Sequence, residues 1–171
     1  MVLAGALLTA LAVIGSSCGY HSAGQAVRLP PYVKTVAVPA FVNQTQTYRI
    51  EAILTEAVVR EFNTRTHYRI VSDPNGADAV LRGWVTSTQL APLTYDSNTG
   101  RASSALVTVN MKVVLTGRNG KILYENSNYT YREQYQVSRE LSSFFEEQGP
   151  AMQRLSTDFA RTLVSNVLEL Y

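Results

Sequence analysis

The chain has 171 residues, of which 46% are hydrophobic and 16% are charged. This length fills a single domain, and so large an apolar fraction excludes disorder for most of the chain. Fifteen lysines and arginines against thirteen acidic residues give a net charge of +2. That charge is too balanced for a protein that neutralises many phosphates, so we expect no nucleic-acid partner. A single cysteine excludes an internal disulfide framework and any multi-cysteine zinc site.

The N-terminal segment is typical of an export signal. Residues 2–14 form an unbroken run of small and apolar residues, with one threonine and no charge. The run is too short to span a bilayer, which needs about 20 residues, but it matches the apolar region of a secretory signal. Residues 15–17 are Gly-Ser-Ser, and Cys18, the only thiol, follows. This arrangement resembles a bacterial lipoprotein signal, in which a peptidase cleaves before a lipid-modified cysteine.

That resemblance divides the chain into three parts. It implies that residues 1–17 are a signal peptide and that Cys18 carries acyl chains such as palmitate, which would hold the protein on a membrane because each buried methylene contributes about 0.8 kcal/mol. The alternative is a buried N-terminal helix, but the run has no polar face to present to water. Residues 18–31 are small and polar and end in two prolines, which predicts a lipidated tether. We expect residues 32–171 to form one domain.

The first half of this domain predicts a strand and then a helix. Val33–Phe41 is β-branched and apolar, and Pro39 indicates a place near a sheet edge or at a bulge. Residues 43–47 break this strand. From Ile50 to Thr66 the apolar residues recur at the spacing of one helical face: Ile50, Ile53, Leu54, Ala57, Val58 and Phe62.

Three long strands are predicted next. A short extended stretch at Tyr68–Val71 and a turn at residues 73–76 precede the first of them, Ala79–Tyr95, which contains Trp84. The second, Ser104–Thr116, alternates strictly between apolar and mostly polar residues, so one of its faces should be buried. Asn119-Gly120 predicts a hairpin to the third, Lys121–Val137. Residues 92–103 are rich in turn formers and predict a second hairpin whose tip projects from the sheet.

A second amphipathic helix is predicted at the C-terminus. Ser143 with Glu146 forms a candidate capping box, and Pro150 marks a position where the helix starts or kinks. Apolar residues then recur at helical spacing to the end of the chain: Met152, Leu155, Phe159, Leu163 and Val167. The predicted fold is α+β, a two-layer sandwich of a four-stranded, mostly antiparallel mixed sheet with two helices on one face, in the order β-α-β-β-β-α.

The residues for catalysis are few. The two histidines are His21, close to the predicted anchor, and His67, at a helix–strand junction. No serine elbow, zinc-binding histidine pair or phosphate-binding glycine loop occurs. The acidic groups at residues 73–78 and 96–100 lack the order of a calcium loop and are ordinary turn formers. We therefore predict no enzyme activity, no metal and no cofactor other than the covalent lipid on Cys18.

The later strands carry features that suit an interface. Tyr129, Tyr131 and Tyr135 share one side of the last strand at period two, where they can pack in the core or meet a partner. Residues 96–139 contain six basic and three acidic side chains, a modest excess that a solvated face would also explain. The serines and threonines of the long strands suit a sheet face that meets another protein or lies in a wet cavity.

Seven segments together give a resemblance to a known family. They are CGYH at Cys18, VAVPAFVNQT from Val36, REFNTRT from Arg60, ADAVLRG from Ala77, TGRAS from Thr99, KILYENSNYTYREQY from Lys121 and FFEEQGPAMQRLSTDFARTLV from Phe144. In their order and spacing the chain resembles the LPS-assembly lipoproteins, the LptE family, from Cys18 to Tyr171.

This resemblance implies a function without catalysis. LptE proteins are outer-membrane lipoproteins on the periplasmic side, which plug and help assemble a large β-barrel partner, LptD, and help deliver lipopolysaccharide to the outer leaflet. It also implies that Arg101, in the loop between two long strands, and Arg139, after the last strand, contact lipopolysaccharide, because arginine binds phosphate well. The alternative is an outer-membrane lipoprotein that activates a peptidoglycan synthase or builds a secretion channel.

Overall fold

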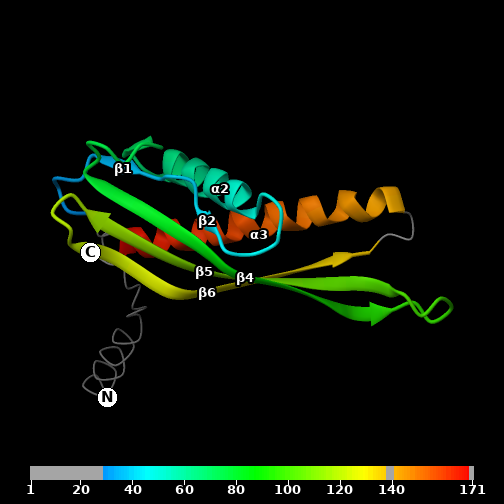
Figure 1. The fold of residues 1–171 in the computed structure, drawn as a ribbon. Helices are drawn as coiled ribbons and strands as arrows, with labels where there is room; N and C mark the ends of the chain where they lie inside the picture. Colours follow the sequence, from blue (N-terminus) through cyan, green and yellow to red (C-terminus); the bar gives the residue numbers. More distant parts are fainter. Residues whose placement is uncertain (1–28, 138–140, 170–171) are drawn as a thin grey trace, which may run out of the picture.

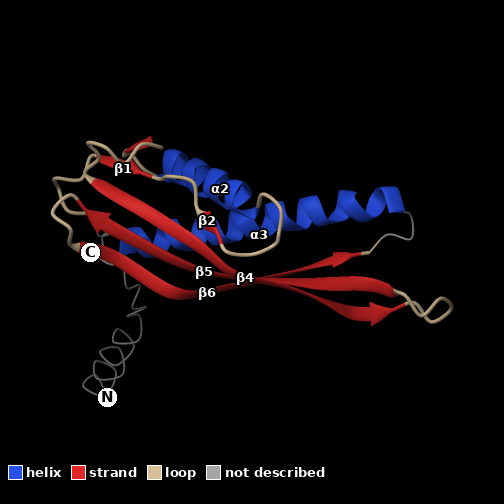
Figure 2. Ribbon diagram, viewed as in Figure 1, coloured by secondary structure: helices blue, strands red, loops and turns tan. Residues whose placement is uncertain are grey.

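The computed structural model describes residues 29–137 and 141–169, with the backbone alone for residues 141–148. The described chain forms two layers: a long twisted β-sheet, and helices α2 and α3, which lie together over one face of it (Figure 1, Figure 2). The opposite face of the sheet carries no helix of the described chain. The predicted α+β class, with a mixed sheet and two helices on one face, is confirmed.

Three long strands form the body of the sheet. These are β4 (Ala79–Tyr95), β5 (Ala102–Gly117) and β6 (Ile122–Gln136), and β5 pairs antiparallel with both of the others. The predicted Asn119-Gly120 hairpin is confirmed, because Gly120 takes the positive φ of 78° that such a tight turn needs. The other predicted hairpin is also present: β4 has the predicted bounds, β5 begins two residues earlier than expected, and residues 96–101 form the turn.

The prediction of four strands was wrong, because the sheet has six. β1 (Thr35–Ala37) pairs parallel with β3 (Arg69–Val71) and with β4, and β2 (Val42–Asn43) pairs parallel with β4. The extended stretch expected at Tyr68–Val71 contains β3, which the count of four strands left out, and β2 is too short to show the alternation by which strands are recognised. Pro39 was expected near a sheet edge or at a bulge: β1 is the second strand from the edge, beside β3, and Pro39 falls in the break between β1 and β2.

Both helices bury the apolar faces that their spacing predicts. Helix α2 (Ile50–Arg65) buries five of its side chains and packs against α3 (Leu141–Glu169). In α3 all five apolar positions predicted to share one face are buried: Met152, Leu155, Phe159, Leu163 and Val167. The helix begins at Leu141, so Ser143 is not its N-cap and Pro150 lies inside the helix.

The sheet extends well beyond its short strands. β2 pairs with β4 only as far as Val85, where a register shift follows, and from Ser87 to Tyr95 β4 pairs with β5 alone. Figure 1 shows this end of β4 and β5 projecting past α2 to the hairpin turn. Leu90, Leu93 and Tyr95 are 54%, 44% and 63% exposed along it. The fold therefore presents a long ribbon with a polar turn at its tip.

Candidate functional site

The first candidate surface is the face of the sheet away from the helices, called here the open face. The strict alternation of β5 directs Val107, Val109 and Met111 into the core, while Thr108 and Asn110 point to the open face. Their cross-strand partners continue the polar surface, since Thr108 pairs with Arg132 on β6. The predicted polar sheet face is therefore present, and the fold leaves it uncovered by any described helix.

A hollow of about 300 Å³ lies in this face where β2, β4 and β5 meet. Trp84 of β4 is partly exposed there and pairs directly with Lys112 of β5 on one side and with Val42 of β2 on the other. The residues that line the hollow are Gln44, Arg82, Trp84, Thr86, Lys112, Val114 and Thr116. It therefore combines one aromatic ring with cations and hydrogen-bonding side chains.

The charges around the hollow are mostly positive. The Lys112 ammonium lies 3.0 Å from a carboxylate oxygen of Glu125 on β6, with both side chains about two-fifths exposed. Arg82 is exposed and forms no ion pair with any residue that the structure describes. One arginine therefore remains available to an anion in the hollow.

The tip of the β4–β5 hairpin is the second candidate surface. Oδ1 of Asp96 accepts hydrogen bonds from the backbone N–H groups of Asn98 and Thr99, both at 2.9 Å, and Gly100 takes a positive φ of 65°. These contacts shape a compact turn that leaves Arg101 exposed beside it. Within the described ranges, Arg101 has no ion-pair partner.

The structure describes one of the two arginines predicted to bind lipopolysaccharide. Arg101 lies at the projecting end of the sheet, as the turn-rich sequence indicates. Arg139 falls outside the described residues, as does Cys18. The last strand nevertheless ends beside the hairpin, because Gln136 pairs with Ser104 and the Val137 N–H donates to the Ser103 carbonyl at 3.0 Å.

The tyrosines of β6 belong to the core. The ring of Phe159 lies edge-on to both Tyr129 and Tyr131, with ring centroids 5.5 Å apart in each pair. Burial raises the pKa of Tyr129 and of Tyr131 above the ordinary value of 10.0, and a hydrogen bond to Tyr124 adds to the shift at Tyr129. Tyr135 is also buried. Of the two roles left open for these side chains, core packing applies.

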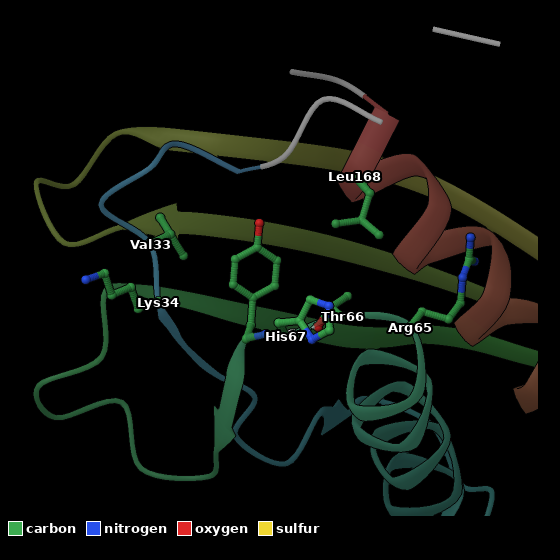
Figure 3. Close-up of a pocket in the computed structure, with 7 residues that line it drawn as sticks. Val33, Lys34, Arg65, Thr66, His67 and Leu168 are labelled. Carbon is green, nitrogen blue, oxygen red and sulfur yellow. Dashed lines mark hydrogen bonds between the residues drawn. The ribbon is translucent and has the colours of Figure 1, made fainter. Parts of the chain in front are cut away.

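His67 lines a separate pocket of about 510 Å³ between the ends of α2 and α3 (Figure 3). No carboxylate lines this pocket among the described residues, and the hydroxyl of Thr66 donates to the Phe62 carbonyl at 2.7 Å. Figure 3 shows the Lys34 side chain directed away from His67, and the guanidinium of Arg65 bonds to Ser165 at 2.7 Å. The Arg65 guanidinium and the Thr66 hydroxyl at this pocket are therefore engaged in hydrogen bonds within the fold.

Two further features are absent from the described ranges. No group of three or more histidine, cysteine or acidic side chains there is placed to hold a metal ion. Neither α2 nor α3 has the length and apolar content needed to cross a membrane.

The hollow at Trp84 was not predicted from the sequence, which placed Trp84 in a strand but indicated no site there. The available signal was the period-two spacing of Arg82, Trp84 and Thr86, which places all three on one face of β4.

Comparison with known proteins gives one family match. The family model LptE, described as lipopolysaccharide-assembly, matches residues 33–167. This span includes β1 and nearly all of α3. A search of curated protein sequences finds no significant match.

Solved structures with the same fold are similar to this chain at low sequence identity. Lipoprotein B from Nitrosomonas europaea has a TM-score of 0.55 and 12% identity, covering 85% of this chain and 87% of its own. Rare lipoprotein B from Shewanella oneidensis has a TM-score of 0.53 and 14% identity, covering 74% of this chain and 91% of its own. A PelC dodecamer from Paraburkholderia phytofirmans has a TM-score of 0.50 and 17% identity, covering 85% of this chain and 93% of the PelC chain. These likenesses describe the fold alone.

Proposed function

This chain belongs to the lipopolysaccharide-assembly (LptE) family, a family of non-enzymatic outer-membrane lipoproteins, and we propose that it plugs an LptD-type β-barrel, assists the assembly of that barrel and helps deliver lipopolysaccharide to the outer leaflet. The observation that carries the proposal is the family match over residues 33–167, which takes in both layers of the fold.

The shape of the sheet supports this role. A plug inside a large barrel meets a polar, water-filled lumen, so its contact surface must itself be polar. The open face, with Thr108, Asn110, Arg132 and their neighbours, has this character. The ribbon that ends at residues 96–101 gives the plug length, and it extends beyond β1, β2 and β3.

The hairpin tip supports contact with lipopolysaccharide. Phosphate groups are natural partners for arginine, which can bind two oxygens at once. Arg101 is exposed at this tip, and the end of β6 lies beside the same hairpin through the pairing of Gln136 with Ser104. We therefore place the glycolipid contact of the plug at Arg101, with Arg139 as its proposed companion.

The lipid anchor at Cys18 is the third part of the proposal, and it rests on the sequence of residues 2–18. Mass spectrometry of protein isolated from membranes should find Cys18 as the N-terminal residue with acyl chains attached. A chain that retains Met1 and a free thiol would contradict both the anchor and the location on the periplasmic side of the outer membrane.

Affinity purification of the tagged, membrane-extracted protein tests the main claim. We expect it to recover a large β-barrel in near-equal amount, recognised by its change in gel mobility on heating. Recovery of a peptidoglycan synthase, of a secretion-channel component or of no partner would contradict the plug and favour the alternative lipoprotein roles.

A further inference from the structure

The side chain of Trp84 lies outside the hydrophobic core. Its ring faces the open side of the sheet, whereas the neighbouring positions Gly83 and Val85 are buried toward the helices. A large aromatic ring that remains partly exposed beside a hollow offers a flat apolar surface for a ligand. It is also the only tryptophan of the chain.

The groups around this ring are those that bind a charged sugar. The apolar C–H faces of a sugar ring can lie against an aromatic face, while its hydroxyls need hydrogen-bond partners close by. Gln44 and Thr116 supply an amide and a hydroxyl at the hollow, and Arg82 and Lys112 supply positive charge. The Thr86 hydroxyl donates to the Asn110 carbonyl at 3.1 Å and can still accept a hydrogen bond from a ligand. An arginine beside such a platform favours a sugar that carries phosphate or carboxylate.

The charge balance of the site selects the anion. Glu125 is the carboxylate that reaches this part of the face, and it is paired with Lys112 at 3.0 Å. Arg82 has no such partner within the described residues, whereas Arg132, which pairs with Thr108 four residues along β5 from Lys112, lies outside the hollow. A neutral sugar would leave this positive charge unused, whereas a phosphorylated one would complement it.

We propose that the hollow at Trp84 is a binding subsite for the phosphorylated saccharide part of lipopolysaccharide, separate from the hairpin tip at Arg101. This inference rests on the proposed function for the source of the sugar. In it Trp84 is the stacking platform, Arg82 binds the anionic group, and Gln44 and Thr86 bind hydroxyls. The glycolipid would thus meet the plug at two places, its sugars on the open face and a phosphate at the projecting hairpin.

The single tryptophan makes the test direct. The full-length lipoprotein in detergent is titrated with lipid-free core oligosaccharide that retains its phosphates, and Trp84 emission is followed. We expect a saturable change in emission, weaker binding after the oligosaccharide is dephosphorylated, and no comparable change with maltoheptaose or inorganic phosphate. No saturable change, or an equal change with inorganic phosphate alone, would overturn the proposal.

Two variants with opposite expected effects on oligosaccharide affinity sharpen this test. Arg82→Gln should weaken oligosaccharide binding about tenfold or more, because a charge-assisted hydrogen bond is lost. Glu125→Gln should strengthen binding, because it removes a negative charge and frees Lys112. Lys121→Gln, an exposed change at the β5–β6 turn, is the matched control and should leave the affinity unchanged. Equal affinities for all three variants and the parent chain would contradict the site.

Two substitutions of Trp84 test the platform itself by calorimetry. Trp84→Ala should lose oligosaccharide binding, while Trp84→Phe, which keeps an aromatic face, should retain part of it. Circular dichroism and the unfolding midpoint of each variant show whether the fold is intact, and a loss of binding equal for Phe and Ala in folded protein would count against stacking.

Failure of this inference and failure of the proposed function give different results. If the barrel co-purifies and lipopolysaccharide crosslinks at the hairpin, but oligosaccharide leaves Trp84 unchanged, the subsite is wrong and the plug remains. If oligosaccharide titrates Trp84 but no barrel is recovered, the plug is wrong and the sugar site remains.

Discussion

Asp78 and Arg118 form an ion pair that joins the residue before β4 to the turn between β5 and β6. The Arg118 guanidinium contacts Oδ1 of Asp78. The other carboxylate oxygen of Asp78, Oδ2, accepts hydrogen bonds from the backbone N–H groups of Lys34 and Thr35, both at 2.9 Å. The Asp78 carboxylate therefore connects the start of β1 and the start of β4 with the turn between β5 and β6.

The two members of this pair should differ in their effect on stability. Asp78→Ala should lower the free energy of unfolding by about 2–3 kcal/mol, because it leaves two backbone N–H groups without their acceptor. Arg118→Ala should cost less than about 1 kcal/mol, because its side chain is 69% exposed. Urea unfolding measures both. Asp78→Asn keeps one acceptor oxygen and should fall between them, and equal losses for Asp78→Ala and Arg118→Ala would contradict this account.

Gly83 allows β4 to pass beneath the ring of Phe41. A Cβ atom built on Gly83 would lie 2.5 Å from that ring, which is itself buried and packed edge-on against Phe159. Gly83→Ala should therefore destabilise the fold by about 1–3 kcal/mol through overpacking. The control is Gly149→Ala in α3, where nothing lies within 4 Å and a gain of about 0.5–1 kcal/mol is expected. Thermal unfolding of both variants decides the matter, and a stabilising Gly83→Ala would show that the ring can move aside.

The tyrosines of β6 should make stability fall in strongly alkaline solution. The pKa of Tyr129 and of Tyr131 is raised in the folded state, chiefly by burial. A folded chain that holds its protons longer than the unfolded chain loses stability as the pH rises above the unfolded value of about 10. The unfolding free energy should be unaffected by these groups below pH 10 and decline above it, with a smaller decline in Tyr129→Phe. An identical slope in parent and variant would refute the assignment to Tyr129.

Two hydroxyls of the same strand provide a contrast at neutral pH. The Tyr129 hydroxyl contacts that of Tyr124 and accepts a hydrogen bond from Nδ2 of Asn166 at 3.0 Å, whereas the buried hydroxyl of Tyr135 has no hydrogen-bond partner among the side chains and backbone that the structure describes. Tyr129→Phe should cost about 1 kcal/mol, and Tyr135→Phe should be neutral or stabilising. Denaturant midpoints of the two variants, measured side by side, test this difference.

The sequence was sufficient for elements with long periodic patterns. The alternation from Ser104 to Thr116 and the helical spacing from Ile50 to Phe62 each identify a buried face without knowledge of neighbours. β2 and β3 show no such pattern, because strands of two or three residues are stabilised by pairing with distant parts of the chain. Local patterning therefore predicted the layers but not the number of strands.

The candidate sites divide in the same way. The exposed position of Arg101 follows from the turn formers around it. The hollow at Trp84 requires Gln44, just after β2, to meet Thr86 of β4 and Lys112 of β5, and only the register of the sheet shows this. A strand pattern can place a tryptophan on a face, but it cannot show what lies beside it.

Arg101 provides the test of the glycolipid contact at the hairpin. Arg101→Glu combined with Arg139→Glu should sharply reduce crosslinking of the protein to lipopolysaccharide, because each change replaces an attraction for phosphate by a repulsion. Arg101→Glu alone should produce part of the loss, since Arg101 is exposed at the tip and has no ion-pair partner among the described residues. Barrel co-purification should not change, and Lys121→Glu, at the other hairpin turn, should leave crosslinking intact. Unaltered crosslinking in the double variant would remove both arginines from the contact.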